Sequence, residues 1–172
     1  MPTGMPGVVQ APAAQRPSAI IVEPVGTGML GVATSAARNG IGWIVLNREA
    51  DYLAPLRAGA SVPIGSVECD NVEVGRIQGR QIAALLPGGG TVLYVEGPGD
   101  AAKLRRSGLE ETRPANVDLV TVRGKWTEES GLHAVAPRLP QQPHEAAAYR
   151  LIACQNDAMA MGARNSPPSP TP

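Results

Sequence analysis

Short apolar runs alternate along the chain with stretches of helical periodicity. The runs fall at residues 19–22, 41–46, 62–67, 91–96, 117–122 and 150–155. Apolar runs of about four to eight residues between turn signals are typical of buried strands in a parallel sheet. Helices are expected between them, at residues 28–38, from a cap at Asp70 or Asn71 to about residue 86, at 101–111, and after Trp126 and Thr127. Strands that alternate with helices through short loops predict right-handed βαβ units, and therefore an α/β fold.

Four segments do not fit this pattern. Residues 1–18 are rich in Pro, Ala and Gly and are expected to form a loose arm, and residues 49–61 are expected to be a long connection. Pro137, Pro140 and Pro143 prevent the helix after Trp126 from continuing. Residues 166–172 form a Pro-rich tail that is predicted to be disordered.

Charge and composition exclude several classes of protein. The 15 Lys and Arg residues balance the 15 Asp and Glu residues, which argues against binding nucleic acid through phosphate neutralisation. No apolar run approaches the ~20 residues that span a bilayer, and the first residues lack the basic and apolar regions of a secretory signal. The chain has only two histidines, and the spacing of its two cysteines matches no zinc pattern. We therefore expect no metal site.

Polar side chains follow the predicted strands, at the edge where open parallel sheets bind ligands. Amides, carboxylates and an arginine can form directional hydrogen bonds with hydroxyl groups, and an indole can cover the apolar face of a sugar ring. The pattern points to a polyhydroxylated ligand. The residues in these positions are Glu23, Asn47, Arg48, Cys69, Asp70, Trp126, Asn156, Asp157 and the loop 97–100.

Structural alternatives apply to the same positions. Arg48 could pair with Glu49 or Asp51, Trp126 could seal the edge of a lobe, and Asp157 could cap a helix. The cysteines could be small buried apolar residues. The cluster Lys103, Arg105 and Arg106 could be a solvated helix face, with one member turned toward the ligand.

One motif resembles the dinucleotide-binding fingerprint. Residues 26–31 read GTGMLG between a predicted strand and a predicted helix, with Glu49 and Asp51 further along. Pro24, however, separates the apolar strand from the first glycine, and the next strand ends in Asn47 and Arg48 rather than in an acid. An NAD(P)-dependent oxidoreductase is therefore an alternative with little support.

Several segments together resemble, in order, the ribose-type periplasmic sugar-binding proteins of ABC transporters, whose fold is shared by the effector domains of lac-repressor-like regulators. They read AIIVEPVGT, IGWIVLNRE, PIGSVECDNVEVGRIQGRQIA, TVLYVEGPGDAAKLRRSGLEE, GKWTEES and LIACQNDAMAMGA. The resemblance covers roughly residues 15–135 and 149–164. Its most specific parts are DN-x-x-x-G-x-x-x-G and QND-x-MA-x-GA.

The resemblance implies a role for seven residues in ligand binding. Asn47 and Arg48 stand at the family's Asp-Arg pair, Arg105 at its ligand arginine, Trp126 at the aromatic that packs on the sugar, and Asn156 at a ligand amide. Cys69 lies at the crossing between lobes, and Glu23 follows a strand near the ligand.

The fold implied is a type I periplasmic-binding-like α/β fold of two Rossmann-like parallel-sheet lobes, incomplete at both ends. Residues 1–68 would form a partial first lobe with its N-terminal arm, and 69–165 the second lobe. The function implied is capture of a sugar or similar polar solute in an inter-lobe cleft, for delivery to a membrane permease, without reaction or cofactor. A periplasmic or cell-envelope location follows from the resemblance alone. The alternatives are the effector-binding domain of a lac-repressor-like regulator and a non-functional fragment.

Overall fold

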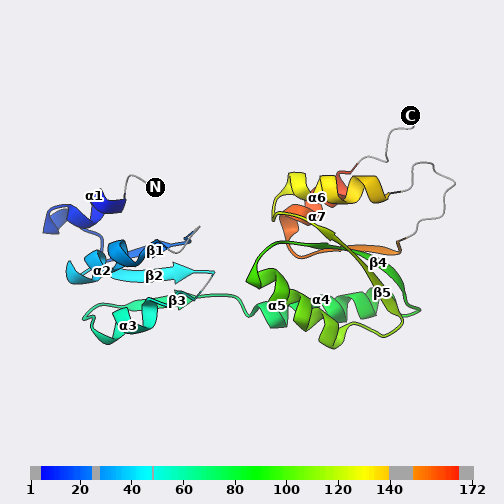
Figure 1. Cartoon of the computed structure of the whole chain (residues 1–172), viewed down its shortest axis with the longest axis horizontal. Helices are drawn as coiled ribbons and strands as arrows, with labels where there is room; N and C mark the ends of the chain where they lie inside the picture. The colour runs from blue at the N-terminus through cyan, green and yellow to red at the C-terminus, as the bar shows by residue number, and fades with distance from the viewer. Residues whose placement is uncertain (1–4, 25–27, 48, 140–148, 167–172) are drawn as a thin grey trace. The chain divides into compact units, whose positions relative to one another are not determined.

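The computed structural model describes residues 5–24, 28–47, 49–139 and 149–166. The chain divides into two compact units, Met1–Cys69 (unit 1) and Asp70–Pro172 (unit 2). Each unit contains a three-stranded parallel sheet with helices packed on it (Figure 1). The predicted α/β class and the six predicted strands are confirmed. Among the described helices, none is long and apolar enough to cross a membrane.

Unit 1 is built on the sheet β1 (Ala19–Val22), β2 (Gly42–Leu46) and β3 (Ile64–Val67), in that order. Trp43 and Val45 of β2 are fully buried on one face. On this side they share a core with Ala33 of α2 (Leu30–Arg38) and Leu53 of α3 (Leu53–Ala58). Burial of the aliphatic and indole surface is the main stabilising term of this layer.

Two short helices of unit 1 differ from the sequence-based expectation. The arm contains α1 (Met5–Gln10), whose Val9 is 1% exposed and joins the core, followed by a 3-10 turn at Ala13–Gln15. The connection at 49–61 contains α3, where Pro55 lies in the first turn, a position that tolerates proline. Six residues are too few to show helical periodicity, and tertiary burial stabilises both helices.

Unit 2 is built on β4 (Gly90–Glu96), β5 (Val117–Arg123) and β6 (Leu151–Cys154), in the order β5-β4-β6. Alternate residues of β4 face two different cores, because side chains alternate along a strand. Val92 and Tyr94 pack with α4 (Asn71–Leu85) and α5 (Asp100–Thr112). Leu93 and Val95 pack with α6 (Glu128–Val135) and α7 (Asp157–Arg164), on the other face (Figure 1).

Glycines allow both helix pairs of unit 2 to approach closely. A Cβ on Gly75 would lie 2.0 Å from the carbonyl oxygen of Arg105, and one on Gly108 would lie 1.9 Å from that of Val72. In the other pair, a Cβ on Gly162 would lie 1.8 Å from the carbonyl oxygen of Glu128. Gly75 belongs to the DN-x-x-x-G-x-x-x-G segment and Gly162 to the QND-x-MA-x-GA segment. These motifs therefore contain glycines on which helix packing depends.

The ends of the helices follow local signals. Asp70 caps α4 by accepting a hydrogen bond from the Glu73 amide at 2.9 Å. Of the two predicted caps, Asp70 and Asn71, the structure therefore selects Asp70. Helix α6 ends at Val135 and is followed by a 3-10 turn at Ala136–Arg138, which contains Pro137. Pro140, Pro143 and most of the predicted disordered tail lie outside the described residues.

Candidate functional site

Trp126 occupies a strained loop just beyond the carboxyl end of β5. Its φ angle is +65°, a region that bulky residues rarely adopt. The indole Nε1 donates a hydrogen bond to the Pro98 carbonyl oxygen at 3.1 Å. The ring lies so close to Gly97 that a Cβ there would be 2.3 Å from a ring carbon. The loop after β4 thus fixes the ring, and such strain is typical of functional sites.

Arg105 lies beside this indole and is held by three interactions. Its Nε donates to Asn71 Oδ1 at 2.9 Å, its Nη1 donates to the Gln155 carbonyl oxygen, and its guanidinium carbon lies 5.4 Å from the Trp126 ring centroid. Arg105 is therefore the member of the basic cluster that points to the strand ends, whereas Lys103 stays on the surface with Asp100, 2.8 Å away. A guanidinium held in this way is ordered before any ligand arrives.

Asn156 connects the same loops from the end of β6. Its Oδ1 accepts a hydrogen bond from the Met159 amide at 2.9 Å, and its Nδ2 donates to the Trp126 carbonyl oxygen at 3.0 Å. Asn156 is therefore the N-cap of α7. The expectation that Asp157 caps this helix is wrong, because Asp157 is already its first residue and is exposed.

A hollow of about 410 Å³ lies beside these residues in unit 2. Its volume falls within the usual range for small-molecule sites, about 300–1,000 Å³. The polar side chains that line it are Gln78, Gln81, Arg105, Gln155, Asn156 and Asp157. Two residues predicted from the sequence, Arg105 and Asn156, thus share one hollow, and Arg105 connects it to the Trp126 ring.

Gln155 is a buried polar residue that sequence reasoning missed. It is 2% exposed, its Oε1 accepts a hydrogen bond from the Gly97 amide at 3.0 Å, and its Nε2 donates to the Ala102 carbonyl oxygen at 2.9 Å. One amide side chain therefore joins β6 to the glycine loop and to α5. The run RLIACQ does not indicate this role, because the partners of the glutamine come from distant segments. The signal that the sequence offers is its place at the start of the QND-x-MA-x-GA segment.

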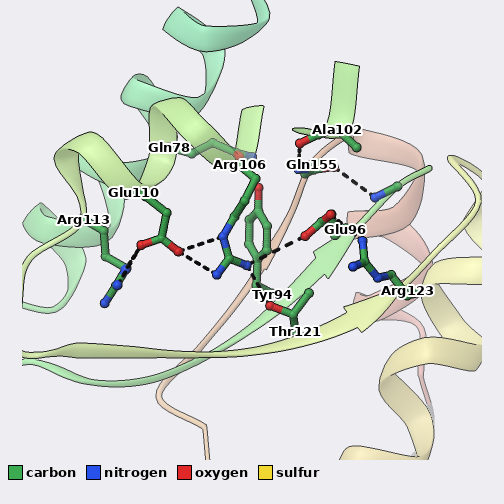
Figure 2. Close-up of polar contacts among 11 residues, drawn as sticks. Gln78, Tyr94, Glu96, Ala102, Arg106, Glu110, Arg113, Thr121, Arg123 and Gln155 are labelled. Atoms are coloured by element: carbon green, nitrogen blue, oxygen red, sulfur yellow. Dashed lines mark hydrogen bonds and ion pairs between the residues drawn. The ribbon is translucent and has the colours of Figure 1, made fainter. Parts of the chain in front are cut away.

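A charged network lies on the α5 side of the site (Figure 2). Glu96, 7% exposed, forms ion pairs with Arg123 and, at 3.8 Å, with Arg106. Arg106 also pairs with Glu110 at 2.6 Å and lies over the Tyr94 ring at 5.6 Å from its centroid. Arg106 is thus half-buried between two carboxylates, not on a wholly solvated face. The network orders the end of β4 that leads into Gly97.

Burial raises the pKa of Tyr94 to about 12. An unfolded tyrosine ionises near pH 10, so the folded state favours the neutral phenol between these values. Below pH ~10 the Tyr94 phenol should not change the free energy of unfolding. Between pH ~10 and ~12 the free energy of unfolding should fall by up to about 1.4 kcal/mol per pH unit. Urea denaturation of the wild type and of Tyr94→Phe checks this expectation. The variant is expected to lose less stability over this range, and parallel pH dependence of the two proteins would contradict it.

Two of the predicted ligand residues of unit 1, Asn47 and Glu23, lie side by side. Asn47 Nδ2 donates to Glu23 Oε1 at 2.7 Å, beyond the ends of β2 and β1, and Asn47 has a positive φ of +62°. Arg48 lies outside the described residues, so its predicted role stays a prediction. Glu49, a suggested partner for it, accepts a hydrogen bond from Ser66 at 3.0 Å. Gly26 and Thr27 of the GTGMLG motif also lie outside the described residues.

The two cysteines occupy different environments. Cys69 is exposed, and Cys154 is partly buried at the end of β6, where burial raises the pKa of its thiol to about 11. The expectation of a buried residue is therefore wrong for Cys69, which follows β3 in an exposed connection.

The raised pKa of Cys154 predicts selective alkylation. Only about one thiol in a thousand would be ionised at pH 8 with this pKa, and the thiolate is the nucleophile. Iodoacetamide is expected to modify Cys69 at least tenfold faster than Cys154. Mass spectrometry of the wild type and of Cys69→Ser checks this, and rapid modification of the variant at Cys154 would contradict it.

In the described part of the chain, no group of three or more His, Cys, Asp or Glu side chains is arranged to hold a metal ion. The chemistry that the site offers is hydrogen bonding and stacking. It combines a guanidinium, an indole and amides at the carboxyl ends of parallel strands.

Comparison with known proteins identifies the family. A model described as "Periplasmic binding protein domain" matches residues 4–166, and the chain belongs to this family. No curated protein matches the chain. A periplasmic solute-binding protein of an ABC transporter from Actinobacillus succinogenes, solved with bound D-allose, is 26% identical with a TM-score of 0.71. The match covers 93% of this chain and 56% of that one.

Two further solved structures share the fold at lower identity. The binding protein of the arabinose ABC transporter from Shewanella, bound to L-arabinofuranose, is 24% identical with a TM-score of 0.66, and the match covers 92% of this chain and 52% of that one. A protein from Mycobacterium smegmatis in complex with β-D-fucofuranose is 21% identical with a TM-score of 0.67. The match covers 95% of this chain and 53% of that one. The chain thus spans about half the length of the solved relatives that it matches.

Proposed function

We propose that the chain binds a sugar or a similar small polyhydroxylated solute and releases it chemically unchanged. In this proposal it acts as the solute-binding component of an ABC transporter, in the periplasm or cell envelope, with a membrane permease as its partner. The observation that carries the proposal is the ordered pair of Arg105 and Trp126 at the strand ends of unit 2.

The pair has the chemistry that a hydroxyl-rich ring requires. Arg105 uses Nε and Nη1 within the protein, and among the described residues no partner is recorded for its Nη2, which is available to a hydroxyl oxygen. The Trp126 indole provides an apolar face for the C–H groups of a sugar ring. Gln78 and Gln81 add amides that can both donate to and accept from hydroxyl groups along the adjoining hollow.

The relatives support the ligand class. Two solved relatives contain bound D-allose and bound L-arabinofuranose, respectively. Small-ligand sites usually bury about 70–90% of the ligand. We therefore expect the hollow beside Arg105 to contribute only part of the contacts around a bound sugar.

Isothermal titration calorimetry with D-allose, L-arabinose and NADP tests the proposal. We expect saturable heats with at least one sugar and none with NADP, and NMR of the recovered sugar should show no chemical change. Saturable binding of NADP without sugar binding, or conversion of the sugar into a product, would contradict the proposal.

A further inference from the structure

Gln155 extends the face of β6 that packs on α4 and α5. Leu151 and Ala153 of β6 lie on that face and pack against its core. Side chains alternate along a strand, so Gln155 points to the same side. Its backbone amide donates to the Val95 carbonyl oxygen at 3.1 Å, which continues the pairing of β6 with β4. The sheet therefore fixes the direction of this amide side chain.

The Gln155 side chain is buried, and both ends of its amide are bonded within unit 2. Its Oε1 accepts from the Gly97 amide at 3.0 Å, and its Nε2 donates to the Ala102 carbonyl oxygen at 2.9 Å. Gly97 is itself buried, so an apolar side chain at position 155 would leave a buried N–H group without this acceptor. A residue that is 2% exposed does not present its polar atoms to a solute. Its role therefore differs from that of Arg105.

Contacts from Gln155 reach both Trp126 and Arg105. Gly97, which the side chain of Gln155 holds, packs against the indole. The next residue, Pro98, accepts the hydrogen bond of the indole Nε1 at 3.1 Å. The backbone carbonyl oxygen of Gln155 accepts from Arg105 Nη1, and the Arg105 guanidinium lies over the Trp126 ring, 5.4 Å from its centroid. The contacts thus form a closed ring, in which Gln155 is the member with a buried polar side chain.

The loop that Gln155 holds contains glycines and leads into a helix without a side-chain cap. Gly99, with a φ angle of +86°, is the N-cap residue of α5, and no side chain caps that helix. Glycine loses more conformational freedom on ordering than other residues do. The positive φ of Trp126 is a conformation that persists only where the surroundings enforce it. The two buried bonds of the Gln155 amide therefore help to order both the loop and the indole.

We propose that Gln155 is a positioning residue of the sugar site, which holds the Trp126 ring and the Arg105 guanidinium in the arrangement that a sugar binds without touching the sugar itself. Its effect on affinity rests on the proposed function, whereas its effect on the ring in the unliganded protein does not. Groups that are ordered in advance need not be ordered when the ligand binds. Loss of the Gln155 amide should therefore weaken sugar binding through the mobility of Trp126 and Arg105.

The test compares Gln155→Met with a matched control, Thr112→Val. Methionine keeps the length and the unbranched shape of glutamine but removes both side-chain hydrogen bonds. Thr112 Oγ1 donates to the Arg76 carbonyl oxygen at 2.9 Å and so joins the far end of α5 to α4. Thr112→Val therefore also removes a hydrogen bond between a side chain and a distant backbone group of unit 2, but away from the strand ends.

Three measurements are made on each protein. Circular dichroism establishes that it is folded. NMR of the ¹⁵N-labelled, unliganded protein gives the chemical shift and the relaxation of the Trp126 indole N–H, whose signal is distinguished from that of Trp43 with Trp126→Phe. Calorimetric titration with D-allose and with L-arabinose gives the affinity.

In Gln155→Met we expect the indole signal of Trp126 to shift and to show greater mobility, and sugar binding to weaken about tenfold. In Thr112→Val both should match the wild type. An unchanged indole signal in folded Gln155→Met, or the same change in Thr112→Val, would overturn the proposal. A nuclear Overhauser effect between the sugar and the Gln155 side-chain amide would do so too, because it would make Gln155 a contact residue.

Two further results separate this proposal from others. If the wild type binds neither sugar, the proposed function fails, but the indole signals of the unliganded proteins still decide whether Gln155 positions Trp126. If Gln155→Met does not fold, hydrogen exchange of the wild type decides instead. The Gly97 amide and the Gln155 side-chain amide should then exchange slowly, and rapid exchange of both would overturn the proposal.

Discussion

Replacing Gly108 with alanine is expected to lower the free energy of unfolding of unit 2 by about 3 kcal/mol. Alanine normally stabilises a helix relative to glycine by up to about 1 kcal/mol. Here its Cβ would lie 1.9 Å from the Val72 carbonyl oxygen and 3.0 Å from the Arg76 amide nitrogen. These atoms belong to the backbone of α4 and cannot move aside without separating the two helices.

Gly88→Ala is the matched control, because nothing lies within 4 Å of a Cβ at that position. It should change stability by no more than about 0.5 kcal/mol. Urea denaturation followed by circular dichroism gives the free energies, and hydrogen exchange of α4 and α5 locates the effect. A Gly108→Ala protein as stable as the wild type would show that these helices do not pack as described.

Removing the Arg105 side chain is expected to weaken sugar binding by about 2–3 kcal/mol, or roughly 30- to 150-fold in Kd. The substitution removes Nη2, the donor available to a sugar hydroxyl. It also removes the guanidinium that lies over Trp126 and joins Asn71 to the Gln155 backbone. Calorimetric titration of Arg105→Ala with the sugar that the wild type binds most tightly measures the effect.

Lys103→Ala is the control for this prediction, because it removes a cation from the same helix two residues earlier. Lys103 pairs with Asp100 and its side chain is 77% exposed. Its loss should leave sugar affinity unchanged within about twofold. Equal losses in the two variants would indicate a general effect of charge, and an unchanged affinity of Arg105→Ala would remove Arg105 from the site.

Much of the fold is predictable because its main signals are local. Each strand is an apolar run bounded by turn residues, and the alternation of strands and helices determines a parallel arrangement. The helices α1 and α3 were missed because their stability comes from burying Val9 and Leu53 in a core formed by other segments. No periodicity over six residues could have shown this.

The candidate site, too, was predictable only in part. Strand ends can be located from sequence, so Trp126 and Asn156 could be placed at the ligand edge, whereas Arg105 lies on α5 and was proposed only from the family resemblance. The direction of each side chain depends on partners that are distant in the chain. Asn156 caps α7 and holds the Trp126 loop, and Gln155, whose position in the QND segment did not reveal its partners, joins Gly97 to Ala102. These contacts are visible only once the loops are assembled.

An NMR titration of the ¹⁵N-labelled chain with D-allose tests the central claim most directly. We predict saturable shifts of the Trp126 indole and of the backbone amides of Gly97, Arg105 and Asn156, with no change in the core strands of unit 1. Saturable binding that leaves these four residues unperturbed, or no shifts at all even at a large excess of each sugar tested, would contradict a sugar site at the strand ends of unit 2.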